Sequence, residues 1–89
     1  MLYRIITEHK NFADIVTVLM QHFDGFTTYR AQGVWKNTIE PALIIEIDDV
    51  TDGETVVFTK VHYIIDAIKE MNNQECVLLQ QIPSNSEVL

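Results

Sequence analysis

Apolar residues recur along the chain with two different periods. A period of two is typical of half-buried β-strands, and a period of three to four is typical of amphipathic helices. The elements that these periods predict, in order, are a strand at 2–9, a helix at 12–23, a strand at about 26–36, a strand at 42–50, a helix between the loop 51–54 and residues 72–73, and a strand at 75–82. The predicted order is therefore β-α-β-β-α-β.

Local signals mark the ends of these elements. Asn11 directly precedes the first helical pattern and is expected to be its N-cap. Gly25 follows that helix in the dipeptide "DG", where a left-handed C′ residue is expected. The segment "NTIEP" (37–41) is expected to be a turn that joins two strands as a hairpin, with Pro41 at the start of the second strand.

This order of elements is the split βαβ, or ferredoxin-like, arrangement. It predicts an α+β fold, in which a four-stranded antiparallel sheet carries two helices on one face. The chain has 89 residues, which is the size of one domain. We expect a single domain over 1–83 and a short polar C-terminal tail over 84–89.

Two helices can cover only one face of a four-stranded sheet, so the composition of the other face matters. If Tyr3, Ile5 and their period-two partners meet the helices, the open face is mixed but substantially apolar. That composition is typical of a subunit interface, although scattered surface hydrophobics on a monomer remain an alternative. The residues expected on the open face are Leu2, Arg4, Ile6, Ile44, Glu46, Leu78, Gln80 and Ile82, with Arg4 and Glu46 as an interface ion pair.

Composition excludes several classes of protein. Six Lys and Arg residues stand against 13 Asp and Glu residues, and the net charge of −7 argues against a general nucleic-acid binder. No apolar run is long enough to span a membrane. Cys76 is the only cysteine, so no internal disulfide can form, and a cytoplasmic location is expected. Cys76 lies among apolar residues and is expected to be a packed thiol.

The predicted second strand has an unusual composition for one that only covers a core. Arg30 can grip an anion with two hydrogen bonds, Gly33 allows close approach, and Trp35 can stack on a nucleobase. The expected ligand-binding residues are Arg30, Gly33, Trp35, Lys36 and Lys60. We expect the Tyr29 and Trp35 face to pack inward and the cations to face a cleft between subunits. The alternative is that Gly33 marks a bulge, Trp35 packs across strands and the cations pair with nearby acids.

The segment "GFTTYRAQGVWKN" (25–37) resembles the second strand of PII-like proteins, in which a glycine after the first helix opens a strand of the form G-[FYM]-T…G-x-[GW]. The segment "IKEMNNQECVLL" (68–79) is similar to the last helix-to-strand passage of such chains. The resemblance to the PII and CutA kind of protein implies a compact homotrimer with ligand sites between subunits. In PII-like proteins these sites commonly bind adenine nucleotides. A long signalling loop is absent here, because only "NTIEP" joins the two strands.

Other chemistry is less clearly indicated. His9, His22 and His62 lack metal-ligand spacing, the acidic run 47–54 lacks the alternation of a calcium loop, and no cofactor motif or catalytic triad is present. The sequence therefore favours a small-ligand-binding module that acts as a sensor or sequesters its ligand. The alternative is a structural or interaction module that self-assembles through its open sheet face. An enzyme would need His9 or His62 beside an acid, and rests on fold analogy alone.

Overall fold

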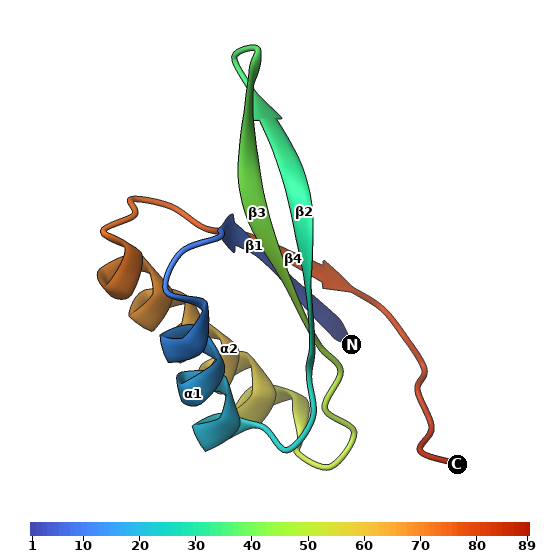
Figure 1. The fold of residues 1–89 in the computed structure, drawn as a ribbon. Coiled ribbons are helices and arrows are strands. Elements are labelled where there is room, and N and C mark those ends of the chain that lie inside the picture. The colour runs from blue at the N-terminus through green and yellow to red at the C-terminus, as the bar shows by residue number, and fades with distance from the viewer.

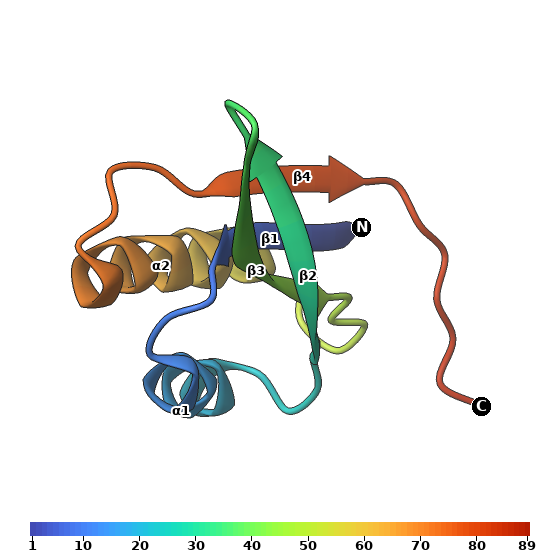
Figure 2. The ribbon, with the colours of Figure 1, turned by 45° about the horizontal axis from the view of Figure 1, so that its top comes forward.

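The computed structural model describes all residues 1–89, and its elements follow the predicted order (Figure 1). The elements are β1 (Leu2–Glu8), α1 (Phe12–His22), β2 (Thr27–Trp35), β3 (Thr38–Ile47), α2 (Glu54–Asn72) and β4 (Leu78–Ile82). The strands form one antiparallel sheet in the order β2-β3-β1-β4. Both helices lie on the same side of this sheet (Figures 1 and 2). The predicted ferredoxin-like α+β fold is confirmed.

The core lies between the sheet and the two helices. Alternate residues of β1 and β3, among them Ile5 and Ile45, point toward the helices and are fully buried. The helices contribute residues at a spacing of three or four, because that spacing places them on one helical face. The buried core residues are Tyr3, Ile5, Ile15, Leu19, Phe23, Leu43, Ile45, Ile47, Val57, Val61, Ile64, Ile65 and Ile68. The expectation that Tyr3, Ile5 and their period-two partners meet the helices is confirmed.

The ends of α1 agree with the prediction only in part. Asn11 adopts the left-handed conformation, with φ 53°, and its side chain does not cap the helix. Its Nδ2 instead donates to the carbonyl oxygen of Met71 at 2.9 Å and to Oδ1 of Asn72 at 3.0 Å. At the other end, the chain leaves the helix through extended backbone at Phe23, and Gly25 has no positive φ. Asn11 therefore occupies the predicted N-cap position without capping the helix through its side chain, whereas the predicted left-handed turn at Gly25 is wrong.

Buried polar groups connect the end of α2 to β1. Thr7 on β1 and Asn72 on α2 are buried, and each donates a hydrogen bond to Oε1 of Gln74, at 2.8 and 3.2 Å. The amide nitrogen of Gln74 in turn donates to the carbonyl oxygen of Cys76 at 2.8 Å. Since buried polar groups are costly unless they are hydrogen-bonded, these contacts fix the path of the chain from α2 toward β4.

This path shortens the last strand. β4 begins at Leu78 instead of residue 75, and Cys76 lies before it with an exposed side chain. The prediction of a packed thiol is therefore wrong. β3 also ends earlier than predicted, at Ile47, because the carboxylate of Asp49 accepts hydrogen bonds from Thr51 and Asp52 and turns the chain. Burial alone would raise the pKa of Asp49, but these hydrogen bonds lower it.

The hairpin of β2 and β3 is longer than predicted. Lys36 and Asn37 both have positive φ, 49° and 62°, and form a two-residue turn that brings Trp35 opposite Thr38. Turns of this length fit the twist of the flanking strands when both central residues are left-handed. β3 therefore starts at Thr38, and the predicted turn over 37–41 is wrong. The far half of the hairpin projects beyond the helices (Figures 1 and 2).

The core arrangement predicts a large stability difference between two matched truncations. Replacing Ile45 by Ala should lower the free energy of unfolding by about 2–5 kcal/mol, since it leaves a cavity under both helices. Replacing Val56 by Ala, on the exposed side of α2, should change it by less than about 0.5 kcal/mol. Urea unfolding followed by far-UV circular dichroism measures both. Equal effects would contradict the placement of Ile45 in the core.

Candidate functional site

The strand register assigns each side chain of β2 to a face of the sheet. Tyr29 lies opposite Ile44 and Thr27 lies opposite Glu46, which belong to the open face. Tyr29 and Trp35 therefore lie on the open face and are 43% and 69% exposed. The prediction that they pack inward is wrong. Thr28, opposite the buried Ile45, takes the inward position, and Trp35 lies in the part of the hairpin that no helix covers.

The same register places Arg30 on the helix-facing side, next to the end of β1. Its Nε donates to Nε2 of His9 at 3.2 Å. The His9 ring stacks on the ring of Phe12, with centroids 5.8 Å apart and an interplanar angle of 15°. The backbone N–H of His9 also donates to the carbonyl oxygen of Pro41 at 3.3 Å. His9 thus ties Arg30 to β1, to α1 and to the hairpin.

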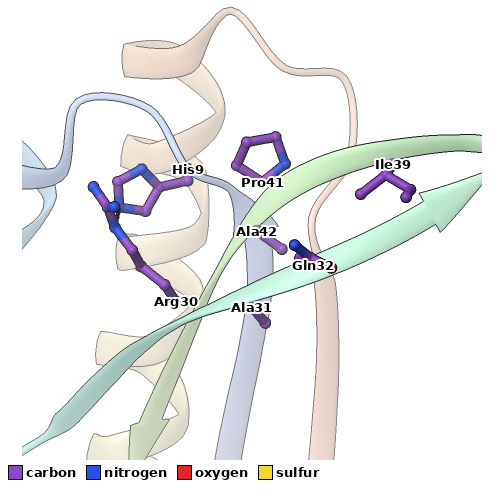
Figure 3. A pocket seen from close by; sticks show the side chains of 7 residues that line it. All are labelled: His9, Arg30, Ala31, Gln32, Ile39, Pro41 and Ala42. Atoms are coloured by element: carbon purple, nitrogen blue, oxygen red, sulfur yellow. Dashed lines mark hydrogen bonds between the residues drawn. The ribbon is translucent and has the colours of Figure 1, made fainter.

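Arg30 and His9 line an open hollow of about 550 Å³ (Figure 3). The remaining lining residues come from the two hairpin strands: Ala31, Gln32, Ile39, Pro41 and Ala42. Arg30 and His9 lie together at one side of the hollow, and Gln32 and Ile39 lie on the other (Figure 3). The terminal amino groups of Arg30 make no hydrogen bond within the chain, so they are available to an anion. The hollow therefore combines a cation, an amide and an apolar floor.

A second, smaller hollow adjoins this one through His9 and Pro41. It is about 370 Å³ in volume, and Glu8, Lys10 and Glu40 complete its lining. Lys10 forms an ion pair with Glu8 at 3.0 Å. The positive charge that serves the larger hollow therefore comes from Arg30.

Three of the predicted ligand-binding residues lie on the hairpin outside the Arg30 hollow. Gly33 is paired regularly with Glu40, so it does not form a bulge, and an added Cβ would meet only the Glu40 carbonyl oxygen at 3.8 Å. Lys36 is in the turn, with its Nζ 5.7 Å from the centre of the Trp35 ring. Trp35 and Lys36 thus form the exposed tip of the hairpin instead of a wall of the hollow.

Lys60 lies in a different part of the molecule from Arg30. Its Nζ donates to Oδ2 of Asp52 at 2.8 Å and to the carbonyl oxygen of His22 at 3.0 Å, and it lies 5.6 Å from the centre of the Phe23 ring. The hydrogen bond to Asp52 raises the pKa of Lys60, although partial burial opposes this. These contacts tie α2 to the end of α1 and to the loop before α2. The structure does not bring Lys60 and Arg30 together.

The open face carries the predicted ion pair between strands. Arg4 Nη2 lies 2.8 Å from Oε2 of Glu46, and Arg4 Nη1 donates to Oε1 of Gln80 at 3.2 Å. The hydrogen bond to Glu46 raises the pKa of Arg4. Ile44 is already buried beneath its neighbours, whereas Leu78 is 55% exposed. The large exposed apolar side chains on this face are therefore Leu78, Tyr29 and, toward the tip of the hairpin, Trp35.

Of the seven residues that line the hollow, only Arg30 was assigned to the ligand from the sequence, and His9 is the missed residue that holds Arg30 in place. Its partner in the hollow is a guanidinium, so the acid–histidine pair that an enzyme would need is not formed by its hydrogen bond. Residues 9 and 30 approach each other only because β3 lies between β1 and β2 and because α1 begins next to His9. Spacing along the sequence contains no signal for this contact. No group of three His, Cys, Asp or Glu side chains is arranged to hold a metal ion.

Comparisons with known proteins agree with the fold. No protein-family model matches the chain, and no curated protein matches its sequence. A DUF3240-family protein from Shewanella baltica OS155 is similar, with a TM-score of 0.66, 15% identity, and coverage of 99% of this chain and 94% of that chain. A phage SAM lyase in complex with S-methyl-5'-thioadenosine has a TM-score of 0.60 and 16% identity, over 88% of this chain and 76% of that chain.

A third similar structure is a de novo designed protein, Foldit4, with a TM-score of 0.55, 13% identity and coverage of 94% of each chain. At these identities the likeness shows a shared ferredoxin-like fold alone. Neither helix of this chain combines the length and the apolar character that a membrane span requires. The comparisons therefore leave function to be argued from the Arg30 hollow and the open face.

The position of Lys60 predicts a structural role for this residue. Replacing Lys60 by Gln removes a charged donor from both Asp52 and the end of α1, so the thermal midpoint of unfolding should fall. Replacing Lys69 by Gln makes the same change of charge on α2 without an ion pair to lose, and should leave the midpoint nearly unchanged. Differential scanning calorimetry measures both variants. A Lys60 variant as stable as the Lys69 variant would contradict this role.

Proposed function

We propose that the protein is a PII/CutA-like, self-associating protein that binds a small anionic ligand of the nucleotide type in the Arg30 hollow. The observation that carries this proposal is the arrangement of Arg30. Its Nε is held by His9, while its terminal amino groups are free at the rim of a hollow of about 550 Å³. A guanidinium fixed in this way can bind a phosphate or carboxylate by donating two parallel hydrogen bonds to it.

The remaining lining suits a ligand with an apolar or flat part. Ile39, Pro41 and two alanines supply apolar surface, and the amide of Gln32 can both donate and accept hydrogen bonds. Ligand sites commonly have this composition, in which a few polar groups fix the orientation of a ligand in an apolar hollow. The phage SAM lyase of similar fold was solved with S-methyl-5'-thioadenosine, an adenosine derivative. This likeness supports a nucleoside-type ligand on such a scaffold.

The hollow offers binding groups without an arrangement for catalysis. Its titratable side chains are Arg30 and His9, which are hydrogen-bonded to each other, and no nucleophile with an adjacent base lines it. A role in sensing or sequestering the ligand fits this composition better than a reaction does.

The open sheet face supports self-association, and a homotrimer is the arrangement that the PII/CutA resemblance implies. Tyr29 and Leu78 are large, exposed and on the same face, with the Arg4–Glu46 ion pair between the strands that carry them. Burial of exposed apolar side chains drives most protein association. If no ligand exists, this face alone supports the second candidate function, a structural or interaction module that assembles through its sheet.

The ligand proposal predicts that adenosine monophosphate binds through Arg30. Replacing Arg30 by Gln should weaken the affinity at least tenfold, because two charge-assisted hydrogen bonds are lost and each contributes about 1.5–3 kcal/mol. Replacing Lys69 by Gln removes a charge elsewhere and should leave the affinity unchanged. Isothermal titration calorimetry with adenosine monophosphate, adenosine and inorganic phosphate measures these differences. Failure of all three to bind the wild-type protein would overturn the proposal.

The assembly proposal predicts that the wild-type protein has at least the mass of a trimer and that Leu78→Lys lowers this mass by breaking the open-face contact. A lysine in an apolar interface leaves a buried charge, whereas in the monomer position 78 is exposed and tolerates it. Met20→Lys changes an equally exposed residue on α1 and should leave the trimer intact. Sedimentation velocity gives the mass of each variant. A wild-type monomer at all concentrations would contradict self-association.

A further inference from the structure

The far end of the β2–β3 hairpin carries exposed apolar side chains that nothing in its own chain covers. Val34 and Ile39 are 70% and 66% exposed, and Trp35, on the opposite face of the same ribbon, is exposed as well. β3 pairs with β1 only from Ala42 onward, so this part of the hairpin has no third strand. A two-stranded ribbon without a third strand or a packed helix is marginally stable in water. The ribbon is therefore suited to packing against another chain.

The tip of this hairpin is also positively charged. Lys36 forms no ion pair within its own chain, and its ammonium group lies over the Trp35 ring. Arg4, Lys10 and Lys60, in contrast, are all engaged by carboxylates of the same chain. Although the protein has a net charge of −7, the tip thus carries an ammonium group without an ion pair beside exposed apolar side chains.

The opposite end of the molecule has complementary chemistry. The chain between α1 and β2 and the loop before α2 surround a hollow of about 410 Å³, which Val50 and four aspartates line. Three of these aspartates accept hydrogen bonds within the chain. Asp48 accepts from Ser84 and Ser86, Asp49 from Thr51, and Asp52 from Lys60. Asp24 makes no hydrogen bond or ion pair. Lys60 also lines the hollow, so four carboxylates and one ammonium group leave its lining net negative. The hollow thus offers the carboxylate of Asp24 and the exposed side chain of Val50.

We propose that the hairpin tip of one copy docks into this hollow of a second copy, with Lys36 paired to Asp24 and Trp35 packed beside Val50. The occupant is a second copy of this chain, because the tip and the hollow are complementary in charge and both carry exposed apolar side chains. The two elements lie at opposite ends of the molecule, whose longest extent is 40 Å (Figure 1). The contact is therefore heterologous, and repeating it closes a ring or builds a filament. It is separate from the open-face contact proposed above.

An exchange of charges between the two elements tests this contact. Lys36→Asp keeps a residue that tolerates the left-handed turn but reverses the charge at the tip, and Asp24→Lys reverses the charge of the hollow. Each single variant should weaken self-association at least tenfold, because it places like charges together. The double variant should recover the wild-type association constant. An equimolar mixture of the two single variants should recover it in part. Trp35→Ser should also weaken association, while Lys69→Glu, a matched charge reversal on α2, should not.

Sedimentation equilibrium over a range of protein concentrations measures the association constants, and circular dichroism verifies that each variant is folded. Two results would overturn the proposal: single variants that associate like the wild type, or a double variant as weak as the singles. If Leu78→Lys dissociates the protein while the hairpin variants do not, the open-face contact stands and the hairpin contact is wrong. Binding of adenosine monophosphate to Arg30 is measured separately, so a failure of either proposal is distinguishable from a failure of the other.

Discussion

The antiparallel register between β1 and β3 is the constraint on which the other features of this protein depend. Burial of Ile5 opposite Ile45, beneath both helices, fixes this register, because a slip by one residue would move every apolar side chain of the strand to the open face. The pairing of β2 with β3 then determines which face of the sheet each side chain of β2 occupies. Tyr29 is thereby assigned to the open face and Arg30 to the helix-facing side. The position of the only guanidinium in the hollow is thus a consequence of how the core packs.

The same constraint explains why the hollow forms where β1 ends. β1 stops at Glu8, whereas β3 begins four residues before its pairing with β1, so the hairpin passes beyond the rest of the sheet. His9 lies at this step and uses its backbone for Pro41 and its ring for Arg30 and Phe12. The hollow forms because β1 is shorter than the β2–β3 hairpin, and His9 lines it on the side of β1. The left-handed turn at Lys36 and Asn37 determines how far the hairpin reaches.

The sequence predicted the fold well because the fold follows from periodicity. The core positions of β1, β3 and both helices recur at spacings that only strands or helices can produce, and no competing pattern overlaps them. The hairpin was predicted less well, since Thr38–Pro41 has polar and turn-forming residues but lies in a strand as a result of the two-residue turn. The faces of β2 were misassigned for a physical reason. Trp35 is large and apolar, yet it lies in a ribbon that extends past the helices, so its size gives no information about burial.

Placement of the site required distances that the sequence does not contain. Arg30 was recognisable as a candidate because a strand that only covers a core has little use for a guanidinium, but its contact with His9 depends on sheet order. Lys60 was equally plausible as a ligand residue until its contacts with Asp52 and His22 were known. The chain shares its fold with a lyase and with a designed protein, so the fold alone does not select a function. What distinguishes this chain is where its few cations remain unpaired. Arg30 has free amino groups beside a hollow, and Lys36 has a free ammonium group at an exposed tip. Lys69 on α2 is also without an ion pair, but it lines neither the Arg30 hollow nor the aspartate-lined hollow. In a strongly acidic protein, Arg30 and Lys36 are therefore the cations best placed to meet an anion or a second acidic surface.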